Sequence, residues 1–137
     1  MANKGPLERG VVAMMYRISF EFRLTRLVPW TDDGIDFYSH VEAVRDKVEA
    51  HEAVYGVRVV TNRTESSLTF DFTIEAARHQ LAEEFALEVV GAAIESAGAR
   101  HFGMSPLGPS LTTSAGANSG MDTPVWHRRR ILVGVAA

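Results

Sequence analysis

The sequence predicts an α+β fold in which helices cover one face of an antiparallel sheet. Residues 16–24, YRISFEFRL, alternate strictly between apolar even positions and polar odd positions, and residues 68–74, LTFDFTI, repeat the pattern. Such alternation is typical of a strand with one buried face and one solvated face. Each of these segments is followed by a long stretch of helical spacing. A strand followed by a helix, occurring twice, indicates one sandwich built from two similar halves.

The composition fits a single soluble domain. The 137 residues are 46% hydrophobic, which is enough for a substantial core. The net charge of −3 gives no general attraction to nucleic acid or anionic membranes. The absence of cysteine excludes disulfides, thiolate metal sites and a cysteine nucleophile. Because no apolar run approaches the roughly 20 residues that cross a bilayer, we expect no membrane span. The expected location is the cytoplasm or a particle assembled inside the cell.

The first half of the chain predicts an arm, a strand and a helix. Residues 1–15 are expected to form an N-terminal arm that leads into the first strand. Asp32 and Asp33 are of the type that begins helices, because carboxylates suit the positive end of the helix dipole. Between residues 35 and 54 the apolar positions are spaced by four, three and four residues, which predicts an amphipathic helix. These positions are Phe37, Val41, Val44 and Val48.

The second half predicts a hairpin, a second helix and a short closing strand. The β-branched residues 57–61 form a strand that the polar residues 62–67 join to strand 68–74. A long helix is expected over residues 76–97, with Gly98 as its stop. Residues 100–104 supply the closing strand.

The resulting order is strand, helix, strand, strand, helix, strand. This order is that of the ferredoxin-like βαββαβ two-layer sandwich, with a swapped or extended sandwich as the alternative. The sequence thus divides into an arm over residues 1–15, a sandwich domain over 16–104 and a C-terminal linker and docking segment over 105–137. The linker is rich in Ser, Gly, Thr and Pro, as flexible segments are.

The docking segment combines an aromatic residue, a basic cluster and a β-prone run, VWHRRRILVGVAA. Trp and Arg are the residue types that most often anchor interfaces. Residues 131–135 are expected to add a strand to a sheet edge, in the same chain or in a neighbour. The alternatives are a disordered terminus and contact of the three arginines with phosphate, for which three cations give a modest electrostatic contribution.

Two surfaces are therefore expected to contact partners. The long helix has one apolar stripe containing Leu81, Phe85 and Val89, and a second stripe beside it that the core does not require. We expect the second stripe and the docking segment to bind a partner. The predicted partner-binding residues are Leu87, Val90, Ile94, Trp126, Arg128, Arg129, Arg130, Ile131 and Val133.

No motif predicts catalysis, a cofactor or a metal site. The sequence has no GxSxG elbow, no GxGxxG or Walker A loop and no HExxH pattern. His40 and His51 are eleven residues apart, so on one helix they lie three turns from each other. The paired strand phenylalanines share parity with Ile18 and Ile74, which predicts core packing rather than a base-stacking platform. We therefore predict no catalytic residues, no metal ligands and no cofactor, and do not expect nucleic acid as the partner.

The predicted function is a non-catalytic assembly or interaction protein, as a homo-oligomer or a subunit of a larger complex. A virion or another multi-subunit shell is one setting in which small subunits are laced together by arms. The first alternative is a small-ligand-binding or cofactor-free enzyme domain that uses a pocket of a ferredoxin-like dimer, lined by Trp30, His40 and Asn62. The second alternative is a nucleic-acid adaptor that acts through Arg128, Arg129 and Arg130.

Overall fold

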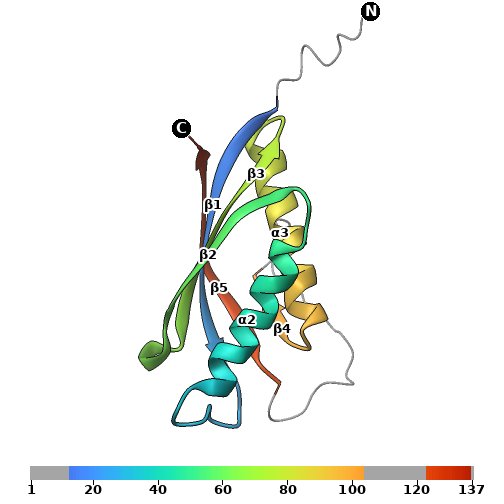
Figure 1. The fold of residues 1–137 in the computed structure, drawn as a ribbon. Helices are drawn as coiled ribbons and strands as arrows, with labels where there is room; N and C mark the ends of the chain where they lie inside the picture. Colours follow the sequence, from blue (N-terminus) through green and yellow to red (C-terminus); the bar gives the residue numbers. More distant parts are fainter. Residues whose placement is uncertain (1–12, 104–122, 137) are drawn as a thin grey trace, which may run out of the picture.

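The computed structural model describes residues 13–103 and 123–136, in which two helices lie on one face of a five-stranded sheet (Figure 1). The predicted α+β class is confirmed. Residues 1–12 of the predicted arm and residues 105–122 of the predicted linker lie outside the described residues. The elements are β1 (Met14–Thr25), α2 (Ile35–Glu49), β2 (Val54–Asn62), a 3₁₀ turn (Arg63–Glu65), β3 (Ser67–Ala76), α3 (His79–Ser96), β4 (Arg100–Phe102) and β5 (Val125–Val135).

The strand order differs from the one predicted. It is β2-β3-β1-β5-β4, with β1 antiparallel to both β3 and β5 and with β4 parallel to β5. In the predicted arrangement the closing strand at residues 100–104 would lie beside β1. The C-terminal strand occupies that place instead, and the closing strand moves to the sheet edge. Strand length explains the difference, because β5 offers eleven residues to pair along β1 and β4 offers three.

The alternation in β1 produces the core as predicted. Ile18, Phe20, Phe22 and Leu24 are fully buried beneath the helices. Phe20 lies opposite Phe70 on β3, so the phenylalanines of both strands share one face. Full burial of such a side chain contributes about 1.5–3 kcal/mol relative to exposure. The core-facing prediction for these aromatics is therefore confirmed, and the odd positions of β1 form the opposite, open face of the sheet.

Helix α2 ends earlier than the predicted residue 54. Its apolar stripe is buried as expected, at Phe37, Val41, Val44 and Val48. The backbone N–H of Ala50 still donates to the Asp46 carbonyl, but His51 then donates to Val48 and Val54 donates to His51. These bonds close a turn that leads directly into β2. The predicted N-terminal carboxylates act in the loop before the helix, where Asp33 accepts a hydrogen bond from the Ile35 N–H at 3.1 Å.

Helix α3 packs against the β4 end of the sheet at Gly91. The buried His101 of β4 lies over this glycine, where an added Cβ would be 3.5 Å from the imidazole Nε2. The same Nε2 lies 2.8 Å from a carboxylate oxygen of Glu95, one turn further along the helix. A distance of 3.5 Å is an ordinary van der Waals contact, so the site has room for a methyl group.

We expect Gly91→Ala to stabilise the protein by about 0.5–1 kcal/mol, because alanine loses less backbone entropy than glycine inside a helix. The matched control is Gly98→Ala. Gly98 follows the helix at φ 84°, a left-handed conformation that a Cβ disfavours, so the same substitution there should destabilise by about 1 kcal/mol. Urea unfolding measures both values. A destabilising Gly91→Ala would show that His101 cannot accept the methyl group.

Candidate functional site

Trp126 of the predicted docking segment lies in the core of its own chain. The side chain is 0% exposed, and its indole Nε1 donates to His40 Nε2 on α2 at 2.9 Å. Its ring packs edge-on against Phe22 with centroids 5.0 Å apart. The contact with Phe22 holds β5 against β1, and the hydrogen bond to His40 joins β5 to the helix layer. In this structure Trp126 anchors a strand of the same chain and presents no surface to a partner.

The predicted stripe on α3 is buried as well. Leu87, Val90 and Ile94 belong to the core cluster. The apolar surface that α3 presents to solvent lies on its other stripe, where Leu81 is 39% exposed and Phe85 is partly buried. The two stripes are thus oriented in the opposite sense to the one predicted, because both are apolar and their residue types do not distinguish the core side.

The residues predicted on β5 divide between the two faces of the sheet. Ile131 and Val133 lie on the helix side, opposite Phe20 and Ile18 of β1, and are partly buried against the core. The arginines are separated by a β-bulge: Glu21 pairs with Arg130 and Phe22 pairs with Arg128, which leaves one extra residue between them. Such a bulge lets two consecutive side chains face the same way.

Arg129 and Arg130 both reach the open face because of this bulge. Arg130 forms an ion pair with Glu21, with an N–O distance of 3.7 Å. Arg129 lines a hollow together with residues of the open face. Arg128 lies on the helix side, where burial lowers the pKa of its guanidinium and Glu83 opposes that shift. The predicted cluster of three arginines is thus divided two to one between the faces.

The open face gathers arginines from four strands. Arg17 and Arg23 lie on β1, Arg58 lies on β2 opposite Asp71, and Arg100 lies on β4. None of these arginines was predicted to bind a partner, because they are scattered along the chain. They share a face because of the register in which the strands pair, and the alternation within a single strand does not reveal that register.

One end of the open face is hollowed. The hollow has a volume of about 360 Å³ and is lined by Arg23, Thr25, His127 and Arg129. The Thr25 hydroxyl lies 3.1 Å from His127 Nε2. Burial, and then the neighbouring charge of Arg23, lowers the pKa of His127, so this imidazole is mostly neutral at pH 7. The hollow therefore presents two permanent cations, one neutral ring and one hydroxyl.

An aromatic pair adjoins this hollow. The Phe102 ring of β4 is stacked on His127, with centroids 5.5 Å apart and an interplanar angle of 18°. The Arg100 guanidinium carbon lies 5.7 Å from the Phe102 centroid. We name Arg23, Thr25, Arg100, Phe102, His127 and Arg129 the open-face cluster.

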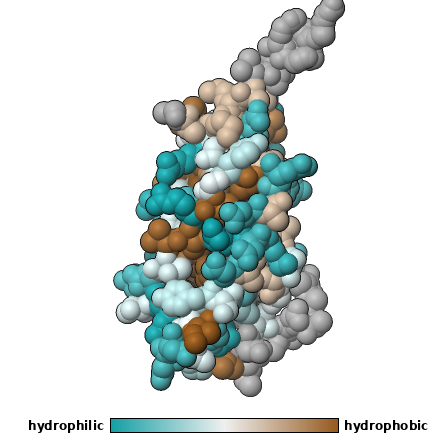
Figure 2. Space-filling view, viewed as in Figure 1, coloured by the Kyte–Doolittle hydropathy of each residue, from teal (hydrophilic) through white to brown (hydrophobic). Residues whose placement is uncertain are grey.

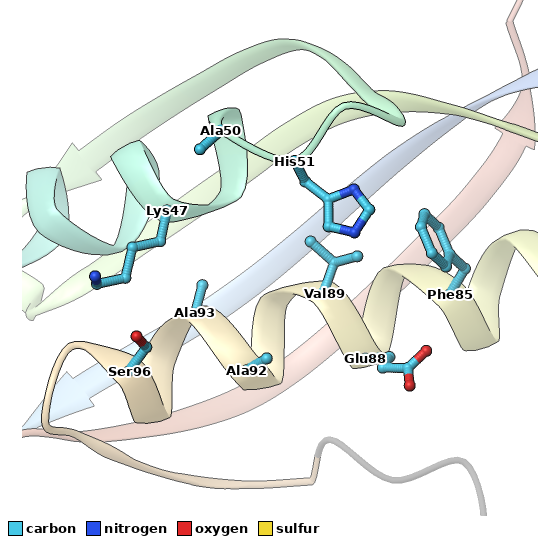
Figure 3. A pocket seen from close by; sticks show the side chains of 9 residues that line it. All are labelled: Lys47, Ala50, His51, Phe85, Glu88, Val89, Ala92, Ala93 and Ser96. Atoms are coloured by element: carbon cyan, nitrogen blue, oxygen red, sulfur yellow. The ribbon is translucent and has the colours of Figure 1, made fainter.

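The helix layer carries a different surface, a groove between α2 and α3 (Figure 3). Figure 3 shows the His51 side chain, from the turn that follows α2, facing Phe85, and Val89 pointing from α3 toward α2. The His51 and Phe85 rings meet edge-on, with centroids 5.2 Å apart. This part of the groove has a volume of about 370 Å³, and a hollow of about 400 Å³ continues on the other side of Phe85. Acidic residues line the edge of the groove: Glu88 borders both hollows and Glu84 borders the second.

Charge is segregated between the two layers. Helices α2 and α3 contain eight acidic and two basic residues, whereas the five strands contain seven arginines and three acidic residues. In Figure 2 hydrophilic residues cover much of the surface, and hydrophobic residues show between them as separate patches. The small net charge of −3 thus conceals a large charge separation across the molecule.

The residues proposed for the pocket alternative are brought together in part. Trp30 stacks near His40, with centroids 6.4 Å apart, and contacts Phe37 edge-on. Asn62 lies elsewhere, where its side chain accepts a hydrogen bond from Glu65 N–H and caps the 3₁₀ turn. Within residues 13–103 and 123–136, no three potential metal-ligating side chains gather. Neither of the two described helices is long and apolar enough to cross a membrane.

Comparison with protein-family models, curated proteins and solved structures found no match to this chain.

Proposed function

We propose that this chain is an assembly protein whose copies associate through surfaces of opposite charge, the helix layer of one copy against the open sheet face of the next. The observation that carries the proposal is the segregation of charge between the layers. Surfaces of complementary potential steer encounter and fix the orientation of the bound pair. One copy supplies both kinds of surface.

Apolar side chains lie on both of these surfaces. On the helix layer they are Leu81 and Phe85, beside the groove. On the open face they are Val60, opposite Thr69, and Leu132, opposite Ser19; both are more than half exposed. Buried apolar contacts stabilise association while charges mainly give orientation and rate. We expect an interface that combines apolar contacts with opposite charges to form a reversible assembly that weakens as salt is added.

The proposed contact joins two different surfaces, so it is heterologous. Heterologous contacts generate rings when the rotation closes and open filaments when it does not. Pairing of α3 with α3 of another copy is disfavoured, because Glu84 and Glu88 would face like charges. A ring, filament or shell subunit is therefore the form of assembly that we propose.

Two charge-reversed variants test this proposal, because truncation before β5 would remove Trp126 from the core. The first variant is Glu84→Lys with Glu88→Lys on the helix layer, and the second is Arg17→Glu with Arg58→Glu on the open face. All four side chains are exposed. Each variant alone sets like charges against each other at the substituted positions, lysines against arginines or glutamates against glutamates, so each should lose self-association. Mixing them restores opposite charges and should restore the assembly.

Light scattering of each variant and of the equimolar mixture gives the masses. We expect the unmodified protein to exceed monomer mass at low salt and to dissociate toward 0.5 M salt, where screening shortens the range of these charges to a few ångströms, about half its value at 0.1 M. A mixture that stays monomeric, while the unmodified chain assembles, would exclude contact between these two surfaces. A monomeric unmodified chain at all salt concentrations would overturn the proposed function.

A further inference from the structure

The open-face cluster combines groups that together fit one class of ligand. Arg23 and Arg129 enter the same hollow from neighbouring strands, and a guanidinium is the side chain best suited to bidentate contact with a phosphate. The Thr25 hydroxyl and the His127 ring line the same hollow and can donate or accept further hydrogen bonds. The hollow therefore contains the groups that bind an oxyanion.

The aromatic pair beside the hollow adds a second recognition element. Phe102 and His127 lie nearly parallel, and His127 belongs both to the pair and to the hollow. An aromatic surface next to a cationic groove is the arrangement with which proteins hold single-stranded nucleic acid, because each base has a flat face and each phosphate a charge. A carboxylate from a protein partner would use the arginines and leave the aromatic pair without a role.

We propose that the open-face cluster binds a nucleotide unit, with its phosphate between Arg23 and Arg129 and its base packed against the Phe102–His127 pair. Two sources share this chemistry, a free nucleotide and one unit of a single-stranded nucleic acid. Further arginines lie on this face beyond the hollow: Arg130, which pairs with Glu21, follows Arg129 on β5, and Arg17 lies further along β1. A strand running along the face would contact these arginines next.

This binding site stands independently of the proposed assembly, because it depends on the cluster alone. One consequence does rest on the proposed function: a bound strand and the acidic helix layer of a second copy would occupy the same face. Nucleotide binding would then compete with assembly. Different substitutions test the nucleotide site and the assembly contact, so one proposal can fail while the other holds.

The experiment measures fluorescence anisotropy of fluorescein-labelled single-stranded decamers, oligo(dT) and oligo(rA), with the full chain at several salt concentrations. Adenosine monophosphate and inorganic phosphate serve as unlabelled competitors. The cluster variant is Arg23→Gln with Arg129→Gln. Its matched control is Arg45→Gln with Arg78→Gln, which removes the same charge from other surfaces. Circular dichroism checks that each variant is folded.

We expect the cluster variant to bind the decamers at least about tenfold more weakly than the control. Its salt slope should fall by about 0.7, because the two arginines contact one phosphate and each phosphate contact on a single strand contributes about 0.7. Phe102→Leu should weaken binding by about 5- to 150-fold, which corresponds to the loss of one stacked base. Competition by adenosine monophosphate at low concentration identifies a free nucleotide as the ligand. Its failure to compete, while the decamer binds, identifies a single strand.

Three results would overturn the inference. Inorganic phosphate that competes as well as the nucleotide would show that the aromatic pair plays no part. Equal effects of the cluster variant and the control would show that binding is unspecific attraction. The absence of binding to any probe, together with self-association that the cluster variant weakens, would assign the face to an acidic protein surface and leave the proposed assembly intact.

Discussion

Trp126→Ala is expected to lower the free energy of unfolding by about 3–5 kcal/mol, the range found when a large buried aromatic residue is truncated. The indole is fully buried, and it packs against Phe22, Phe70 and His40. Its removal also takes away the donor that satisfies His40 Nε2. Because β5 lies between β1 and β4, loosening it exposes two further strands. Urea unfolding followed by circular dichroism measures the change.

The matched control for this prediction is Leu132→Ala on the same strand. Leu132 lies on the open face and is 54% exposed, so its truncation should cost under about 1 kcal/mol. The comparison separates burial of the indole from a general weakening of β5. If both variants unfold at the same urea concentration as the unmodified chain, the C-terminal strand is not anchored in the core.

The local elements of the fold could be predicted because their signals are local. Alternation located β1 and β3 and assigned their buried faces, and the spacing of Phe37 to Val48 located α2 with its core side. The order of strands could not be obtained in this way. Pairing depends on which segments offer the longest matching ladder, and β5 is separated from β1 by a hundred residues of chain. The segment 131–135 was expected as a short edge strand, and it proved to be the end of an eleven-residue central strand.

The candidate site could be predicted in its residue types but not in its arrangement. Trp126 and the arginines beside it were singled out together, and the structure separates the core anchor from the exposed cations. A β-bulge between Arg128 and Arg130 changes the parity of the strand, and no sequence signal marks it. Arg23, Arg100 and Phe102 join Arg129 only through sheet register. For Arg23 the signal in the sequence was the polar parity of its strand, which identifies a face without identifying the residues beside it on other strands.

The stability of the fold is expected to depend on pH through His40. Burial, and then the charge of Arg26, lowers the pKa of His40 from 6.5 to about 4. The hydrogen bond favours the same neutral form, because Nε2 accepts from the Trp126 indole and a protonated ring could not accept. The unfolded chain takes up this proton below about pH 6.5, and the folded chain does so only near pH 4. The folded state is therefore favoured above this window, and stability falls as the pH decreases through it.

The expected loss between pH 6.5 and pH 4 is about 3 kcal/mol, since one pKa unit corresponds to about 1.4 kcal/mol. Carboxylates also titrate in this range, so the measurement compares the unmodified chain with His40→Gln, whose amide oxygen can still accept from the indole. The variant should show a shallower dependence of unfolding free energy on pH. Parallel curves for the unmodified chain and His40→Gln would mean that the His40–Trp126 bond does not couple protonation to the anchoring of β5.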